Sequence, residues 1–142
     1  MRALIDANVI VDALLPSEVR PGGDRQAAIR VLDACADGSI TGVITPVIFA
    51  FVTHAVKPRR ADHRERMEKA LEFLLDITEW AAITPDDCRT ALTSSFNDVE
   101  DGIQFFACRR LDAIITRDVK DFREHVHVPV LQPKEFVARH LK

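Results

Sequence analysis

Residues 3–15, ALIDANVIVDALL, decide the fold because their apolar pattern changes from that of a strand to that of a helix. Ala3-Leu4-Ile5 is too short an apolar run for a helix and fits a strand that is buried on both faces. After Asp6 the apolar residues change to helical spacing, and Pro16 stops that helix. The segment is therefore predicted to be a strand followed directly by a helix, with Asp6 at the carboxyl end of the strand.

The same alternation continues along the rest of the chain. Further strands are predicted at Ile40–Thr45, around Ala82-Ile83, at Asp112–Thr116 and at Val130-Leu131. The sequence predicts helices over 24–36, from Pro46 to about 56, over 62–78, from Thr84 to a break near 94–97, from Asn97 or Asp98 through Arg110, and from Pro133 onward. Repeated strand-to-helix alternation indicates an α/β fold with a parallel sheet and helices on both of its faces.

Length and composition favour one folded domain over residues 1–142. The chain has 142 residues, of which 47% are hydrophobic and 29% charged, and this composition excludes disorder for most of its length. No apolar run approaches the roughly 18 residues that span a bilayer, so we expect no membrane partner and a cytoplasmic location. The three cysteines lack the spacing of a disulfide framework or a zinc site.

The charge balance limits the ways in which the protein could bind nucleic acid. Nineteen Lys and Arg against 22 Asp and Glu give a net charge of −3. This value argues against binding through positive charge over the whole molecule. Local patches remain possible, and the clearest is KPRRADHRER at residues 57–66, where basic residues outnumber acidic ones.

Acidic residues gather where parallel strands are predicted to end. They are Asp6 after the first strand, Asp118 after the fourth, and Asp98, Glu100 and Asp101 at the start of the helix that leads into the fourth. Active sites of open parallel sheets collect at this edge of the sheet. Carboxylates brought together there repel one another unless a cation is present, and several oxygen ligands suit Mg²⁺ or Mn²⁺. The sequence therefore predicts a divalent metal site.

Each of these carboxylates also has a purely structural interpretation. Asp6 can cap the helix that follows it, Asp118 can cap the next turn, and Asp98 with Asp101 resembles a capping pair. Helical spacing places Asp98 and Asp101 on one face and directs Glu100 elsewhere, which favours Asp101, then Asp98, as ligands. Their joint position at one edge of the sheet favours the functional interpretation.

Two polar residues and one of the acids themselves are predicted to support the metal ligands. Asn8 and Thr116 can hydrogen-bond the carboxylates and hold their rotamers. Glu100 lies between the two favoured acids of its helix and is placed in the same supporting role. Ordinary turn residues are the alternative for Asn8 and Thr116.

Three segments carry a resemblance to a known family. They are LIDAN at 4–8, DVEDGIQ at 98–104, and ITRD at 115–118 with DF at 121–122. Together they resemble the PIN-domain family, metal-dependent nucleases that include the toxins of VapC-type toxin–antitoxin pairs. The resemblance covers essentially the whole chain, and it implies a three-layer α/β/α sandwich with a central, mainly parallel sheet of four to five strands.

The resemblance also implies a metal centre and a reaction. Mg²⁺ or Mn²⁺ would be held by Asp6, Asp101 and Asp118, and Asp98 would orient a water molecule or support a second ion. The implied reaction is hydrolysis of RNA phosphodiester bonds by a metal-activated water, with the ion also neutralising charge in the transition state.

The implied partners are RNA and protein. Arg117, Arg59 and Arg60 would steer the RNA backbone, and solvated surface arginine is the alternative for each. VapC-type proteins commonly dimerise and bury a segment of an antitoxin. A homodimer and a cognate antitoxin are therefore expected from the resemblance alone.

One residue departs from the family pattern and leaves a second function open. The resemblance assigns a glutamate to the helix after the second strand, and this chain has Phe51 there. A catalytically silent PIN module that binds RNA or a protein without cleavage would fit that change. A phosphatase of the haloacid-dehalogenase type is a further alternative, but it needs an acid two residues after Asp6, where this chain has Asn8.

Overall fold

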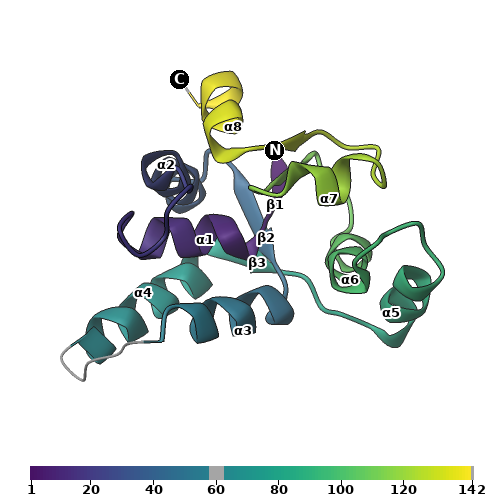
Figure 1. The fold of residues 1–142 in the computed structure, drawn as a ribbon, viewed down its shortest axis with the longest axis horizontal. Helices are drawn as coiled ribbons and strands as arrows, with labels where there is room; N and C mark the ends of the chain where they lie inside the picture. Colours follow the sequence, from purple (N-terminus) through teal and green to yellow (C-terminus); the bar gives the residue numbers. More distant parts are fainter. Residues whose placement is uncertain (58–62, 142) are drawn as a thin grey trace.

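In the residues that the computed structural model describes, 1–57 and 63–141, five strands form one sheet (Figure 1). They are β1 (Arg2–Ile5), β2 (Thr41–Ile44), β3 (Thr78–Trp80), β4 (Ala113–Ile115) and β5 (Val130–Leu131). Their order is β3-β2-β1-β4-β5, and every neighbouring pair is parallel. The predicted parallel sheet of four to five strands is confirmed.

Helices cover both faces of this sheet. They are α1 (Ala7–Leu14), α2 (Arg25–Ala36), α3 (Pro46–Ala55), α4 (Arg64–Ile77), α5 (Pro85–Leu92), α6 (Val99–Ala107), α7 (Val119–Arg123) and α8 (Pro133–His140). Figure 1 shows α1 to α4 on one side of the central strands and α5 to α7 on the other, while α8 packs on α2. The three-layer α/β/α arrangement is confirmed. Within the described ranges no helix is both long and apolar enough to cross a membrane.

The central strand β1 positions the residues that follow it next to those that follow β4. Ala3, Leu4 and Ile5 are each at most 1% exposed, because β2 and β4 flank the strand and helices cover its two faces. Ile5 is paired with Ile115 in β4, and the backbone N–H of Asp6 donates to the Ile115 carbonyl at 3.0 Å. The residues that follow β1 therefore lie beside those that follow β4.

Helices begin at the capping residues that the sequence indicates. Asp24 accepts a hydrogen bond from the backbone N–H of Ala27 at 3.0 Å, which fixes the start of α2. Thr84 and Asp87 form a reciprocal capping box at the start of α5. At α3 the cap is Thr45, directly before a proline that suits the first helical position.

Two predicted elements differ from the observed ones. The strand predicted around Ala82-Ile83 is wrong, because the edge of the sheet is formed by Thr78–Trp80, where the sequence predicted the end of a helix. An edge strand has only one neighbour and need not show the continuous apolar pattern of a central parallel strand. The helix predicted through Arg110 ends at Ala107, and Arg110 has a φ of 57°, which cannot continue a right-handed helix.

Candidate active site

A hollow of about 240 Å³ lies where the chain leaves β1 and β4, and three parts of the chain bring carboxylates to it. The six acids that line it are Asp6, Asp98, Glu100, Asp101, Asp118 and Asp121. We call these six residues and the space between them the acidic hollow. Five of the six are the acids singled out in the sequence, so the fold brings all of those to one place.

Asp6 is fixed by hydrogen bonds to its side chain. Thr116 Oγ1 donates to Asp6 Oδ2 at 2.6 Å, and Asn8 Nδ2 donates to the same oxygen at 2.8 Å. Asn8 Nδ2 also lies 2.9 Å from Asp118 Oδ2, so one amide group bridges two acids. Asp6 occupies the N-cap position of α1 but makes no side-chain capping bond. Asn8 and Thr116 therefore contact the carboxylates of the hollow, and helix capping does not explain Asp6.

Burial and mutual repulsion raise the pKa of two acids in the hollow. Burial raises the pKa of Asp6, with a further rise from the charge of Asp118, although hydrogen bonds from Thr116 and Asn8 oppose it. The pKa of Asp101 is raised to about 7, first by burial and then by the charges of neighbouring acids. Those neighbours are Asp6, Asp98, Asp121 and Glu100. The neighbouring acids are thus close enough for their charges to disfavour ionisation of Asp6 and Asp101.

The other predicted acids differ in how their oxygens are used. Asp98 caps α6, because its Oδ1 accepts from the backbone N–H of Glu100 at 2.8 Å. The capping interpretation is therefore correct for Asp98, whose second oxygen has no part in that bond. Glu100 is exposed at the rim of the hollow. Asp118 precedes α7 without making a side-chain capping bond.

Asp121 is an acid of the hollow that the sequence analysis did not select. It lies three residues after Asp118, in the short helix α7, and its charge contributes to the raised pKa of Asp101. The signal was present in the sequence, because Asp118 and Asp121 have the same spacing as Asp98 and Asp101. Applying the helical-spacing argument to both pairs would have found it.

Phe51 lines the same hollow from α3. Its side chain is 51% exposed, so it does not belong to the core. The position to which the resemblance assigns a glutamate therefore does face the acids. An aromatic ring in this place provides an apolar surface beside the carboxylates instead of another oxygen ligand.

The acids line the hollow without closing on a common point. Within residues 1–57 and 63–141, no three His, Cys, Asp or Glu side chains converge tightly enough to form a complete metal site as they stand. The donor set nevertheless consists of carboxylate oxygens, which hard divalent cations such as Mg²⁺ and Mn²⁺ prefer. Burial first, and the charges of neighbouring acids second, raise the pKa values of Asp6 and Asp101, and a bound cation would relieve the repulsion between these charges. The chemistry of the residues present therefore fits such an ion.

Two arginines near the hollow bind a buried aspartate. Asp12, in α1, is 1% exposed, and its Oδ1 accepts from Arg117 Nη1 and from Arg20 Nε, each at 3.0 Å. Arg20 lines the acidic hollow and was not selected in the sequence analysis. Arg20 lies eight residues after Asp12 across a loop, and Arg117 lies 105 residues after it, so no local pattern links the three. The other predicted RNA-binding residues, Arg59 and Arg60, lie outside the described residues.

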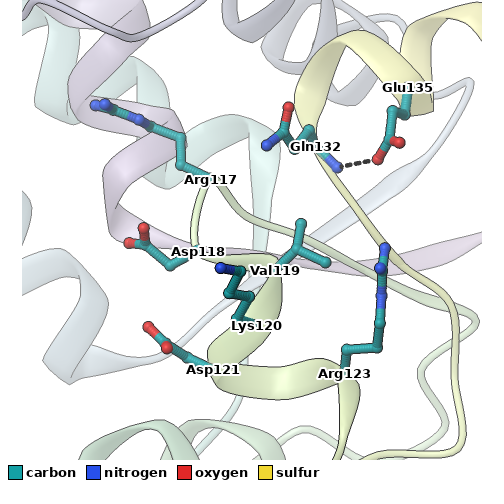
Figure 2. A pocket seen from close by; sticks show the side chains of 8 residues that line it. All are labelled: Arg117, Asp118, Val119, Lys120, Asp121, Arg123, Gln132 and Glu135. Atoms are coloured by element: carbon teal, nitrogen blue, oxygen red, sulfur yellow. Dashed lines mark hydrogen bonds between the residues drawn. The ribbon is translucent and has the colours of Figure 1, made fainter.

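A second hollow of about 530 Å³ adjoins the acidic one and shares Asp118 and Asp121 with it (Figure 2). Figure 2 shows both carboxylates pointing to one side of α7, away from Arg123 on the other. Lys120 and Arg123 bring positive charge to the lining of this second hollow, and both are exposed. The lining of the second hollow thus combines the two shared acids with basic side chains.

Comparison with known proteins places this site in a family. Among curated proteins none matches the chain. The fold is similar to that of VapBC2 from Rickettsia felis, crystallised bound to a DNA fragment from its promoter, with a TM-score of 0.65 and 14% sequence identity over 93% of this chain and 98% of that chain. A family model of the PIN domain matches residues 2–120. That match covers most of the chain, excludes the haloacid-dehalogenase alternative, and shows that this protein belongs to the PIN-domain family.

Proposed function

We propose that this protein is a metal-dependent endoribonuclease that hydrolyses RNA phosphodiester bonds with Mg²⁺ or Mn²⁺ as cofactor. The observation that carries the proposal is the acidic hollow, in which a PIN-domain chain brings six carboxylates together and raises the pKa of two of them. Such repulsion lowers the stability of the metal-free protein, and clusters of acids with raised pKa values are typical of functional sites. Binding a divalent cation is the function that their oxygen atoms fit best.

The proposed roles follow from how each side chain is held. Asp6, Asp101 and Asp118 would hold the ion. None of these three carboxylates caps a helix, whereas that of Asp98 does. When bound, the ion would activate a water molecule and neutralise charge on the phosphate. Asp98 would orient the attacking water with its remaining oxygen. Glu100 at the rim would add to the negative field around the ion.

Asn8 and Thr116 would keep two of the ligands in position. The Asn8 amide reaches both Asp6 and Asp118, and Thr116 Oγ1 donates to Asp6 while accepting from the backbone N–H of Asp118 at 3.0 Å. This network ties the end of β1 to the residues that follow β4. It fixes the rotamers of two acids before any substrate arrives, which reduces the entropy lost on binding.

We further propose that the chain is the toxin of a toxin–antitoxin pair, acts in the cytoplasm and forms a homodimer. The support is the PIN-domain match together with the likeness in fold to VapBC2. The partner would be an antitoxin protein that covers the acidic hollow. Co-expression of the chain with the product of the adjacent gene, followed by co-purification, tests this part separately from the nuclease activity.

Cleavage of end-labelled RNA by the purified protein tests the nuclease proposal. We expect cleavage with Mn²⁺ or Mg²⁺, none with chelator, and none with the variant Asp6→Asn. Asp33→Asn is the matched control, since Asp33 is an exposed aspartate of α2 outside the hollow. Equal cleavage by Asp6→Asn would identify a contaminating nuclease. Binding of RNA by the parent chain without any cleavage would support the silent PIN module instead.

A further inference from the structure

A buried carboxylate anchors two arginines beside the acidic hollow. Asp12 Oδ1 accepts from Arg20 Nε and Arg117 Nη1, each at 3.0 Å, while in the described part of the chain Asp12 Oδ2 has no hydrogen-bond partner. One carboxylate needs only one counter-charge when it is buried. The second guanidinium is therefore surplus to the neutralisation of Asp12, and the three residues together carry one positive charge.

Two glycines of one loop, Gly22 and Gly23, pack closely against Arg117 and Asp12. A Cβ atom on Gly23 would lie 2.5 Å from Cγ and Oδ2 of Asp12, so only glycine lets the loop approach the carboxylate this closely. Gly22 has a φ of 82°, and a Cβ atom there would lie 3.2 Å from Arg117 Nη2. The loop thus packs closely against Asp12 and Arg117 and leaves these two side chains little space to move.

The two arginines are placed differently with respect to the acids. Arg20 lines the acidic hollow, whereas Arg117 lines the second hollow of Figure 2, where its guanidinium points away from Asp121. Arg20 is 35% exposed, and within the described residues Nε is its one side-chain atom that makes a hydrogen bond. Its two Nη groups make no hydrogen bond within the described residues and are therefore free to bind a ligand. An arginine held by Nε presents those groups as a rigid fork that suits phosphate oxygens.

We propose that Arg20 is a substrate-binding residue, whose Nη groups bind a non-bridging oxygen of an RNA phosphate at the acidic hollow. The inference rests on the proposed function for the identity of the polyanion. A phosphate that approaches six carboxylates needs fixed positive charge beside the metal ion, and Arg20 supplies it. Because the bond to Asp12 already orders the side chain, little further entropy is lost when the phosphate binds.

Binding of a fluorescently labelled single-stranded RNA of mixed sequence tests this role without cleavage. The measurement uses Asp101→Asn in chelator, which removes both the metal and one repelling charge. Adding Arg20→Gln to this background should weaken binding about tenfold, as expected for loss of a charged hydrogen bond. It should also reduce the slope of log K against log salt by about 0.7, the value for one phosphate contact on a single strand.

Two further variants separate binding from general effects of charge. Arg139→Gln removes an exposed arginine near the end of α8 that does not line the acidic hollow, and it should change the affinity less than twofold. Arg20→Lys keeps the charge but not the fork, so it should restore most of the salt slope and only part of the affinity. Thermal melting of each variant confirms that it is folded.

The outcomes distinguish this inference from the proposed function. Equal RNA affinity and salt slope for Arg20→Gln and its background would overturn the role of Arg20, even if the parent chain cleaves RNA. Absence of measurable binding by the background at about 50 mM salt would overturn it as well. A parent chain that never cleaves RNA, combined with weaker binding by Arg20→Gln, would reject the nuclease proposal and support the phosphate contact.

Discussion

Two aspartates of the same short segment, Asp6 and Asp12, differ in whether the folded protein pairs them with a basic side chain. Asp12 is buried against two arginine side chains at 3.0 Å. Asp6 has hydrogen bonds from Thr116 and Asn8, and in the described part of the chain no basic side chain is ion-paired with it. Burial raises the pKa of Asp6, and the charge of Asp118 raises it further. The fold thus pairs Asp12 with basic side chains and gives Asp6 no ion-pair partner among the described residues.

This difference predicts a structural role for Asp12 and a functional role for Asp6, although the two residues lie within two helical turns of each other. A buried carboxylate with its own counter-charges is a structural element, because the protein completes it without help. A cluster in which carboxylates outnumber basic side chains costs folding free energy, and such clusters are typical of functional sites. The comparison therefore predicts opposite effects for the same Asp→Asn substitution in the two places.

The largest expected effect is on catalysis. Asp118→Asn should reduce the rate of RNA cleavage at least about 100-fold, because loss of one charged ligand removes transition-state stabilisation of that size. Asp101→Asn should do the same. Initial rates with Mn²⁺ measure the effect, and Asp33→Asn serves as the control. If either variant cleaves at the rate of the parent, that acid is a structural residue, like Asp12, and not a metal ligand.

The next effect in size is on stability. Asp12→Asn should lower the free energy of unfolding by about 3 kcal/mol, because it leaves two arginines facing an uncharged buried group. Asp6→Asn, measured in chelator, should cause no comparable loss, since it removes an acid that other acids repel. Urea denaturation of both variants checks the contrast. Equal destabilisation would show that Asp6 is as much a structural residue as Asp12.

A smaller effect is expected at Phe51, where the hollow has an aromatic ring in place of an oxygen ligand. Phe51→Glu should tighten Mn²⁺ binding about tenfold, the lower end of what a supporting ligand contributes. Phe73→Glu is the matched control, because Phe73 in α4 is 50% exposed and does not line the hollow. Calorimetric titration with Mn²⁺ compares the two. A folded Phe51→Glu variant without any gain in affinity would place the metal away from α3.

The smallest effect is a change in melting temperature with pH. The pKa of Asp101 is about 7 in the folded protein, against about 3.9 for an unfolded aspartate. The folded chain therefore holds the extra proton between these values, and metal-free stability falls as pH rises through about 7. Asp101→Asn should melt above the parent at pH 8 in chelator, by a few degrees once the pKa difference is discounted for the partial exposure of this side chain.

The same measurement includes its own control. At pH 4 the parent aspartate is largely protonated in the folded state, so the two melting temperatures should agree. Adding Mn²⁺ at pH 8 should raise the melting temperature of the parent more than that of Asp101→Asn, since the ion stabilises only the state that binds it. A variant that melts below the parent at pH 8 would show that Asp101 is not under repulsion.

The sequence by itself determined the central strand, the helix starts and most of the acids. Continuous apolar residues mark β1, and caps such as Asp24 and Thr84 mark helix starts, because these signals depend on hydrogen bonds and periodicity within a few residues. Parallel strands end at one edge, so the sequence also placed Asp6, Asp101 and Asp118 together. These conclusions need only local structure and one rule of topology.

The tertiary structure alone decided which acid has a counter-charge. Asp12 and Arg117 are 105 residues apart and meet because the chain after β4 passes beside α1. The edge strand at Thr78–Trp80 and the exposure of Phe51 toward the acids were likewise set by packing. Contacts between distant segments depend on sheet order and register, which no local pattern encodes. For that reason the sequence analysis selected Asp6 but could not show that Asp12 is paired with two arginines.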